Sequence, residues 1–384
     1  MLKKNNKLIY ILLVLLLALS PFVFVPGFSL RSAADFVRFE LSDKSGLNIT
    51  LKTIDPHITA LSADPENDLV MKLVISDKEG LPVPEAGFSI IALDGNAVIQ
   101  PAKGRTGADG SILITYRPSA LPAEAYTNGK TGETLTASIS GSTVKTAFSF
   151  DLVHIPVVLI PGYKAPVSIF GSFASFLKTK GYTSFSLDYS SENGVAYGAV
   201  QLGDLLDKKK QDFLDKGVQV KRFDLIGHSM GGLVARYYTG SREYSGRNDV
   251  EKIIFVSVPQ NGSALASLGL KYYSDKGIYD LIPDSPLFTK DFPGMYNKGL
   301  NNNIQVGSIL GQYDEVVSAE SASLDEWGIR TELFNVGENN FTMDNLLSGK
   351  IVEAANHKAV LFNNKVFRRV EEMLGTKLSF PIKK

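Results

Sequence analysis

The 384-residue chain contains no cysteine. This absence excludes disulfides, a cysteine nucleophile, thiolate metal ligands and lipid anchoring through a cysteine. An exported form of the protein therefore depends on core packing alone. The chain also has no excess charge, with 40 basic and 40 acidic residues, so its composition gives no support for a nucleic-acid partner.

The N-terminus has the layout of an export signal. Three lysines within the first seven residues precede an unbroken apolar run over residues 8–19. The apolar character continues, so that residues 8–28 are also long enough to span a bilayer. We therefore predict that residues 1–34 are a signal peptide or a membrane anchor. We favour a secreted or extracellular protein over one that stays associated with the membrane or cell envelope.

Residues 35–153 have the pattern of a small all-β domain. Short runs with period-two alternation recur between Gly, Pro, Asn and Asp, and no long helical pattern intervenes. The expected strands are at residues 37–41, 47–51, 69–75, 88–92, 111–116 and 147–150. Their spacing predicts a small antiparallel β-sandwich.

Two segments of this region, Val74–Pro84 and Thr106–Ser111, resemble bacterial immunoglobulin-like repeats of the invasin and intimin type. The resemblance implies an immunoglobulin-like sandwich that serves for spacing or contact. No candidate site residue stands out in it. Its lone His57 follows an Asp-Pro pair and is predicted to lie in a surface turn.

A Gly-x-Ser-x-Gly motif, with Gly227, Ser229 and Gly231, lies between an apparent buried strand and an apparent helix. This is the context of a nucleophile elbow. The serine of such a turn has a strained backbone that crowds the residues two before and two after it, and glycine has no Cβ to clash. The helix N-terminus then directs free N–H groups at developing negative charge, so we predict the Met230 N–H as an oxyanion donor.

A serine is a weak nucleophile unless a base takes its proton, so we expect a histidine and an orienting carboxylate later in the chain. His357 is the one histidine after Ser229, and it lies just before the last helical pattern. Asp314, Glu315 and Asp344 are the candidate acids between them. His228 directly precedes the serine, and its side chain is expected to point away from that of Ser229.

From residue 154 onwards the pattern alternates between strands and helices. A continuous apolar run at residues 155–160 is typical of a strand buried on both faces of a parallel sheet. Further strands are expected at 183–187, 250–256 and 304–310, and helices at 167–180 and 194–216. We therefore predict that residues 154–384 form an α/β domain with a doubly wound, mostly parallel sheet, and we place His154 in the linker before it.

Residues 155–374 resemble α/β-hydrolases of the bacterial lipase and esterase type. The resemblance rests on the elbow, on the Pro161-Gly162 turn after the first strand, and on the Gly-x-x-Asp-x-Val-Val pattern around Asp314. It implies that Tyr163 offers a second oxyanion N–H and that Asp314 is the acid. Many lipases have a histidine at the position of Pro161. The side chain of Glu315 is expected to point elsewhere, and Asp344 is the more distant alternative.

An insert at about residues 268–303 is rich in Tyr, Pro, Gly and apolar residues and resembles a lipase lid region. A movable lid and a fixed cap both fit this composition. We predict an exported serine hydrolase that cleaves carboxylic esters, with lipid or acyl esters as substrates, through Ser229, His357 and Asp314 and an acyl-enzyme. This mechanism requires no cofactor and no metal. A catalytically inactive adhesion or scaffold protein is the alternative from another class, and a thioesterase or acyltransferase would use the same triad.

Overall fold

The computed structural model describes residues 46–384 except 94, 122–124, 340, 341, 343, 346, 347 and 349–352. The predicted signal peptide or anchor and the strand predicted at residues 37–41 lie outside the described residues. Within the described ranges, no helix combines the length and the apolar character needed to cross a membrane.

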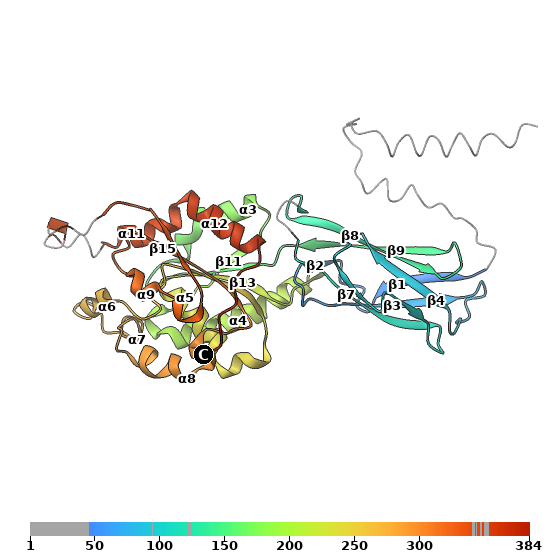
Figure 1. Cartoon of the computed structure of the whole chain (residues 1–384), viewed down its shortest axis with the longest axis horizontal. Helices are drawn as coiled ribbons and strands as arrows, with labels where there is room; N and C mark the ends of the chain where they lie inside the picture. Colours follow the sequence, from blue (N-terminus) through green and yellow to red (C-terminus); the bar gives the residue numbers. More distant parts are fainter. Residues whose placement is uncertain are drawn as a thin grey trace, which may run out of the picture. The chain divides into compact units, whose positions relative to one another are not determined.

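Two sheets that share one hydrophobic core make up the first described part of the chain (Figure 1). One sheet contains β1 (Asn48–Thr53), β3 (Leu69–Ser76), β7 (Ser111–Arg117) and β5 (Val98–Gln100), in this spatial order. The other contains β2 (Ala60–Ser62), β9 (Lys145–Val153), β8 (Lys130–Ile139), β4 (Gly87–Ala92) and β6 (Lys103–Arg105). The sequence prediction missed β2, β5, β6 and β8. The pairing of β2 with β9 is parallel, which departs from the predicted antiparallel arrangement.

The second part is built on a six-stranded sheet in which all neighbours are parallel. Its spatial order is β11 (Ser184–Ser186), β10 (Val157–Ile160), β13 (Phe223–His228), β14 (Val250–Val256), β15 (Gln305–Gly311) and β16 (Thr331–Phe334). This doubly wound, parallel α/β sheet confirms the predicted fold class. The edge strand β16 was not predicted.

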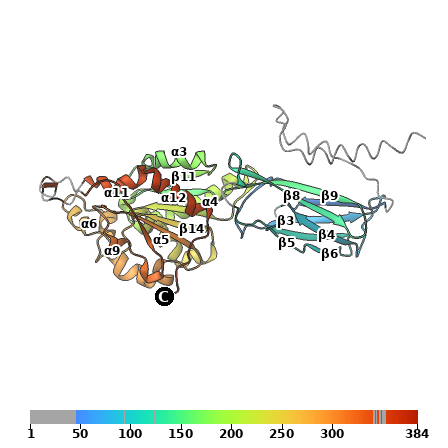
Figure 2. The same cartoon turned by 45° about the horizontal axis from the view of Figure 1, so that its top comes forward.

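Helices cover both faces of the parallel sheet (Figures 1 and 2). Helices α4 (Val195–Leu214) and α5 (Met230–Gly240) pack on one face, and α3 (Gly171–Thr179) and α12 (Asn364–Gly375) pack on the other. Alternate residues of a strand point to opposite faces, so Val158 packs in the first core and Val157 in the second. Burial on both faces explains why these strands are continuously apolar.

The insert predicted at residues 268–303 contains α7 (Lys276–Asp280) and several single-turn helices, and α6 (Ala264–Gly269) leads into it. Part of it packs into the core beside α4 and α5, through Ile278, Leu281, Leu287 and Phe292. Another part exposes apolar side chains, namely Leu268, Leu270, Tyr272, Tyr273 and Tyr279. The insert is therefore anchored at its centre and presents an apolar outer surface.

The sandwich and the α/β part share a sheet. Strand β12 (Val218–Gln219), which follows α4, pairs in parallel with β2 of the sandwich. His154, which we had placed in a linker, is buried, and its ring stacks between Tyr126 at 3.6 Å and Tyr182 at 3.9 Å. His154 does lie in the connection between β9 and β10, as predicted, but aromatic packing fixes it where the two parts meet.

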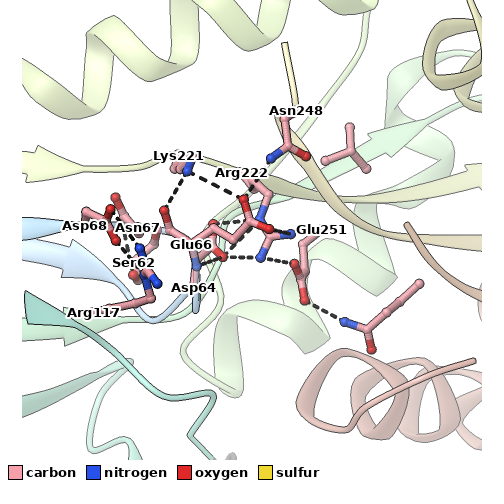
Figure 3. Close-up of polar contacts among 12 residues, drawn as sticks. Ser62, Asp64, Glu66, Asn67, Asp68, Arg117, Lys221, Arg222, Asn248 and Glu251 are labelled. Carbon is pink, nitrogen blue, oxygen red and sulfur yellow. Dashed lines mark hydrogen bonds and ion pairs between the residues drawn. The ribbon is translucent and has the colours of Figure 1, made fainter. Parts of the chain in front are cut away.

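A buried arginine joins the two parts through opposite charges, as Figure 3 shows. Arg222 donates from Nε to Asp64 Oδ2 of the sandwich at 2.9 Å, and its guanidinium also pairs with Glu251 at the start of β14. Burial alone would lower the pKa of Arg222, but the hydrogen bond and charge of Asp64 and the charge of Glu251 raise it instead. Next to this cluster, the Asn67 side chain donates to the Gln219 backbone carbonyl at 2.9 Å, and the Gln219 side chain donates to Asn67 Oδ1 at 2.8 Å, across the same boundary.

Removal of Asp64 should destabilise the whole described unit. Asp64→Ala leaves the buried Arg222 with Glu251 and with the more distant Glu66, which lies 3.9 Å away and is 48% exposed. Loss of one partner of a buried ion pair costs about 3–5 kcal/mol. The matched control is Lys221→Ala, because Lys221 pairs with Glu66 at 3.6 Å where both side chains are 44% or more exposed. That change should cost less than about 1 kcal/mol. Urea unfolding measures both, and equal effects would contradict the role of the buried pair.

Asp224, at the start of β13, should make the stability depend on pH. Its carboxyl is buried, one oxygen has no hydrogen-bond partner among the described residues, and burial raises its pKa to about 8, with Lys252 opposing. The folded state therefore retains a proton that the unfolded chain loses near its ordinary carboxyl pKa. The stability that this group contributes is complete below that value and is lost as the pH rises through about 8.

Asp224→Asn keeps the size and shape of the protonated Asp224 side chain, but it has no proton to lose as the pH rises. Compared with the wild type, the variant should therefore gain several degrees in thermal midpoint at pH 9 and little at pH 5. Differential scanning calorimetry across this range measures the difference. A gain that does not change with pH would show that Asp224 does not titrate in the folded state.

Candidate active site

The backbone at Ser229 has the conformation of a nucleophile elbow. Its φ is 53° and its ψ is −130°, a combination that L-residues rarely adopt, at the junction of β13 and α5. A Cβ atom at Gly231 would lie 2.1 Å from the Ile160 carbonyl oxygen, and one at Gly227 would lie 2.5 Å from the Gly232 Cα. The backbone approach at this turn therefore leaves no room for a side chain at either glycine.

Two unused N–H groups lie beside the serine. Gly162 follows β10 and is in close contact with Ser229, because a Cβ at Gly162 would lie 2.9 Å from the Ser229 Cβ. The next residue is Tyr163, and Met230 begins helix α5. Among the described residues, neither the Tyr163 N–H nor the Met230 N–H has a hydrogen-bond acceptor. Both are therefore available to an oxyanion.

The structure brings His357 and Asp314 together. His357 Nδ1 donates to Asp314 Oδ2 at 2.8 Å, and the Asp314 side chain is 1% exposed. The same carboxylate accepts the backbone N–H groups of Val316 at 2.9 Å and Val317 at 2.8 Å. Burial would raise the pKa of Asp314, but His357 and these hydrogen bonds outweigh it and lower that pKa. Asp314 is thus an ionised, fixed acceptor.

His228 links the elbow to the loop that carries His357. Its Nε2 lies 2.9 Å from the His357 carbonyl oxygen, and the two rings are 4.6 Å apart. Burial, helped by the charge of His357, lowers the pKa of His228 to about 3. His228 is therefore neutral at ordinary pH with its proton on Nε2, because a carbonyl can only accept. It supports the His357 backbone and cannot act as a general base through that nitrogen.

Glu315 is part of the site, contrary to our expectation that its side chain points elsewhere. It is buried, and its Oε2 accepts the backbone N–H groups of Asn356 at 3.0 Å and His357 at 3.1 Å. These N–H groups lie in the first turn of α11 (Ala355–Ala359), whose N-cap residue, Ala354, has no side-chain acceptor and a φ of 52°. Glu315 therefore supplies the cap that this turn lacks. Two features of the sequence could have indicated this role of Glu315: it is an acidic residue next to Asp314, and the helix that carries His357 has an alanine at its N-cap, which cannot accept a hydrogen bond through its side chain.

Two further candidates from the sequence are Asp344 and the hydroxyl of Ser229. Asp344 is exposed and makes no hydrogen bond to His357. Within the described part of the chain, the Ser229 hydroxyl has no hydrogen-bond partner, so the serine and the histidine are not directly bonded in this structure.

A family model, the PGAP1-like alpha/beta domain, matches residues 151–376, which is more than half of the chain. The chain belongs to the PGAP1-like alpha/beta domain family. The matched range of this PGAP1-like domain starts within β9, the last strand of the sandwich, and ends just after α12. It includes Ser229, Asp314 and His357. No curated protein matches the chain.

Several solved structures share parts of the fold. The Bacillus licheniformis lipase BlEst2 in mature form is 14% identical, with 57% of this chain and 91% of that chain covered and a TM-score of 0.43. The phospholipase PlaB from Legionella pneumophila, in complex with thio-NAD, is also 14% identical, covers 57% and 61%, and has a TM-score of 0.39. The D00–D0 domain of intimin is 15% identical, covers 30% and 51%, and has a TM-score of 0.24. All three TM-scores are below 0.5, so family membership rests on the sequence match.

Glu315 should matter for the site of this PGAP1-like domain, although less than Asp314 does. Glu315→Ala leaves the N–H groups of Asn356 and His357 without their acceptor and frees the loop that holds the imidazole. We expect a fall in ester hydrolysis of about 10²-fold, whereas Glu315→Gln keeps one acceptor oxygen and should lose less. Asp314→Asn should cost about 10⁴-fold, because it disturbs the tautomer of His357.

Steady-state kinetics on a small ester measure these effects, and Glu320→Ala, at an exposed carboxylate after the same strand, is the control. Full activity of Glu315→Ala would show that the loop holds its shape without the cap.

Proposed function

We propose that the protein is a serine hydrolase that cleaves carboxylic esters through Ser229, His357 and Asp314 by way of an acyl-enzyme. The observation that carries this proposal is the hydrogen-bonded His357–Asp314 pair at the sheet edge where the strained Ser229 turn begins α5. A serine, a histidine and a carboxylate that follow parallel strands of one sheet meet at the carboxyl edge of that sheet. The reaction class follows from these groups.

Each of these groups has a role in the proposed mechanism. Asp314 accepts the Nδ1 proton of His357, so the neutral ring has a free Nε2 that can take the Ser229 proton as Oγ attacks the ester carbonyl. The N–H groups of Tyr163 and Met230 stabilise the resulting oxyanion. His357 then protonates the departing alcohol, and water hydrolyses the acyl-enzyme by the same route. The Ser229–His357 hydrogen bond forms when substrate binds, as is common in sites without a ligand.

We propose lipid or acyl esters as the substrates. Exposed apolar side chains of the insert, Leu268, Leu270 and Tyr272, lie near Tyr273, whose ring centroid is 6.0 Å from that of Tyr163. An acyl chain bound at Ser229 would have an apolar surface within reach, whereas a small polar ester would gain nothing from it. Hydrolysis should therefore become more efficient as the acyl chain lengthens.

We further propose that the protein is exported, with residues 1–34 as a signal peptide or as an anchor that retains it at the cell envelope. The basic residues before the apolar run at positions 8–19 support export. In this view the two-sheet sandwich is an immunoglobulin-like domain of the invasin and intimin type. Its shared β12–β2 pairing makes it a fixed support of the catalytic part.

A catalytically inactive adhesion or scaffold protein is the second candidate. The free Ser229 hydroxyl and the presence of Pro161 favour it. A thioesterase or acyltransferase would use the same groups with another acceptor or leaving group.

Ser229→Ala should abolish both covalent labelling by a fluorophosphonate and ester hydrolysis, with a loss of about 10⁶-fold in kcat. The fold should persist, because the substitution removes one oxygen at a turn. Ser245→Ala, at an exposed serine away from the site, is the matched control and should behave as the wild type. An unlabelled wild-type protein would favour the inactive scaffold, and full activity of Ser229→Ala would exclude this triad.

A further inference from the structure

The turn that presents the Tyr163 N–H has a disfavoured backbone. The Ala165 N–H donates to the Gly162 carbonyl at 3.2 Å and closes a four-residue turn. Lys164 occupies the third position with a φ of 51°. Glycine or asparagine normally fills such a position, because a positive φ brings an ordinary side chain too close to its own backbone. A lysine here keeps this shape only if its surroundings hold it.

Three polar contacts hold the turn from outside. The Lys164 N–H donates to the Ser191 hydroxyl at 2.8 Å. The Tyr163 hydroxyl donates to Asp275 Oδ2 at 2.7 Å, and the Lys164 ammonium lies 3.2 Å from the same oxygen. One carboxylate oxygen of the insert thus binds both central side chains of the turn.

Asp275 is itself held in place. Its other oxygen, Oδ1, accepts the Ile278 N–H at 3.1 Å and makes Asp275 the N-cap of α7. Burial would raise the pKa of Asp275, but the hydrogen bonds from Tyr163, Ile278 and Lys164 outweigh it, so its pKa is lowered and it is ionised. Gly277 packs against the Tyr163 ring, because a Cβ there would lie 2.9 Å from the ring's Cε2 atom.

We infer that Asp275 is a positioning residue that holds the oxyanion turn, through the side chains of Tyr163 and Lys164, in the shape that presents the Tyr163 N–H to the reacting carbonyl. The inference rests on the proposed function and extends it from the Tyr163 backbone to its side chain. The oxyanion turn, which is residues 162–165, and the start of α7 therefore form one unit. The insert takes part in catalysis through Asp275, although Asp275 does not contact the substrate.

The inference separates transition-state stabilisation from substrate binding. An oxyanion donor acts on charge that develops in the transition state, so a displaced Tyr163 N–H lowers kcat. KM should hardly change, because Asp275 contacts the turn on the tyrosine side chain and not on the ester.

Tyr163→Phe is the sharpest test, since it removes one oxygen and keeps the backbone N–H and the ring. We expect kcat to fall about tenfold with KM within twofold, and the thermal midpoint to stay near that of the wild type. Asp275→Ala should lower kcat further, and Asp275→Asn should recover part of the loss because it keeps an acceptor and a helix cap. Tyr296→Phe, which removes the hydroxyl of a tyrosine that is 47% exposed and bonded to Asn302, is the control and should leave kcat unchanged.

Hydrogen exchange supplies a readout that does not need activity. In Tyr163→Phe and Asp275→Ala, the hydrogen-bonded amides of Lys164 and Ala165 should exchange faster than in the wild type, while those of β13 should not change. Unchanged exchange together with kcat within twofold of the wild type would overturn the inference, as would a loss confined to KM. If Ser229→Ala keeps full activity, the proposed function fails, and the exchange result still decides whether Asp275 holds the turn.

Discussion

The close approach of two backbones beneath Ser229 is the constraint on which the site depends. Helix α5 starts so near the end of β10 that a Cβ at Gly231 would overlap the Ile160 carbonyl. This packing forces Ser229 into its rare conformation and leaves the Met230 N–H free at the first turn of the helix. The same contact brings the Gly162 turn against the serine. The strained backbone of Ser229 and the two free N–H groups beside it therefore result from one close packing contact.

Two adjacent carboxylates then serve one histidine in different ways. Asp314 accepts the ring proton of His357, and Glu315 accepts its backbone N–H. Both follow β15, and consecutive residues in a turn can reach the ring and the backbone of the same partner. The neutral His228 donates to the carbonyl of His357 from the elbow side. His357 is thus held from both sides, at its ring and at its peptide groups, with limited freedom to turn.

At the amino edge of the parallel sheet, buried charges join the two parts of the chain. There, Arg222, Asp64 and Glu251 are buried together, and neither carboxylate nor guanidinium could be buried alone without a large cost. The residues come from the sandwich and from the strands of the catalytic sheet. Shared burial of opposite charges, together with β12 beside β2, joins the two parts into one packed unit. The contacts that join the two parts therefore lie at one edge of the parallel sheet, and the candidate active site lies at the other.

The sequence alone determined the fold class and was enough to predict Ser229, His357 and Asp314 as the candidate residues, because both depend on local patterns. Continuously apolar strands, two glycines around Ser229 and a single downstream histidine are visible without coordinates. The sequence could not predict β2 or β8, because these strands form through pairing with strands that are distant in the chain. It also could not predict the burial of His154 between two tyrosines. It also could not assign Glu315 to the His357 backbone. Such contacts join residues far apart in the chain, and only the tertiary structure decides which of several similar side chains comes within reach.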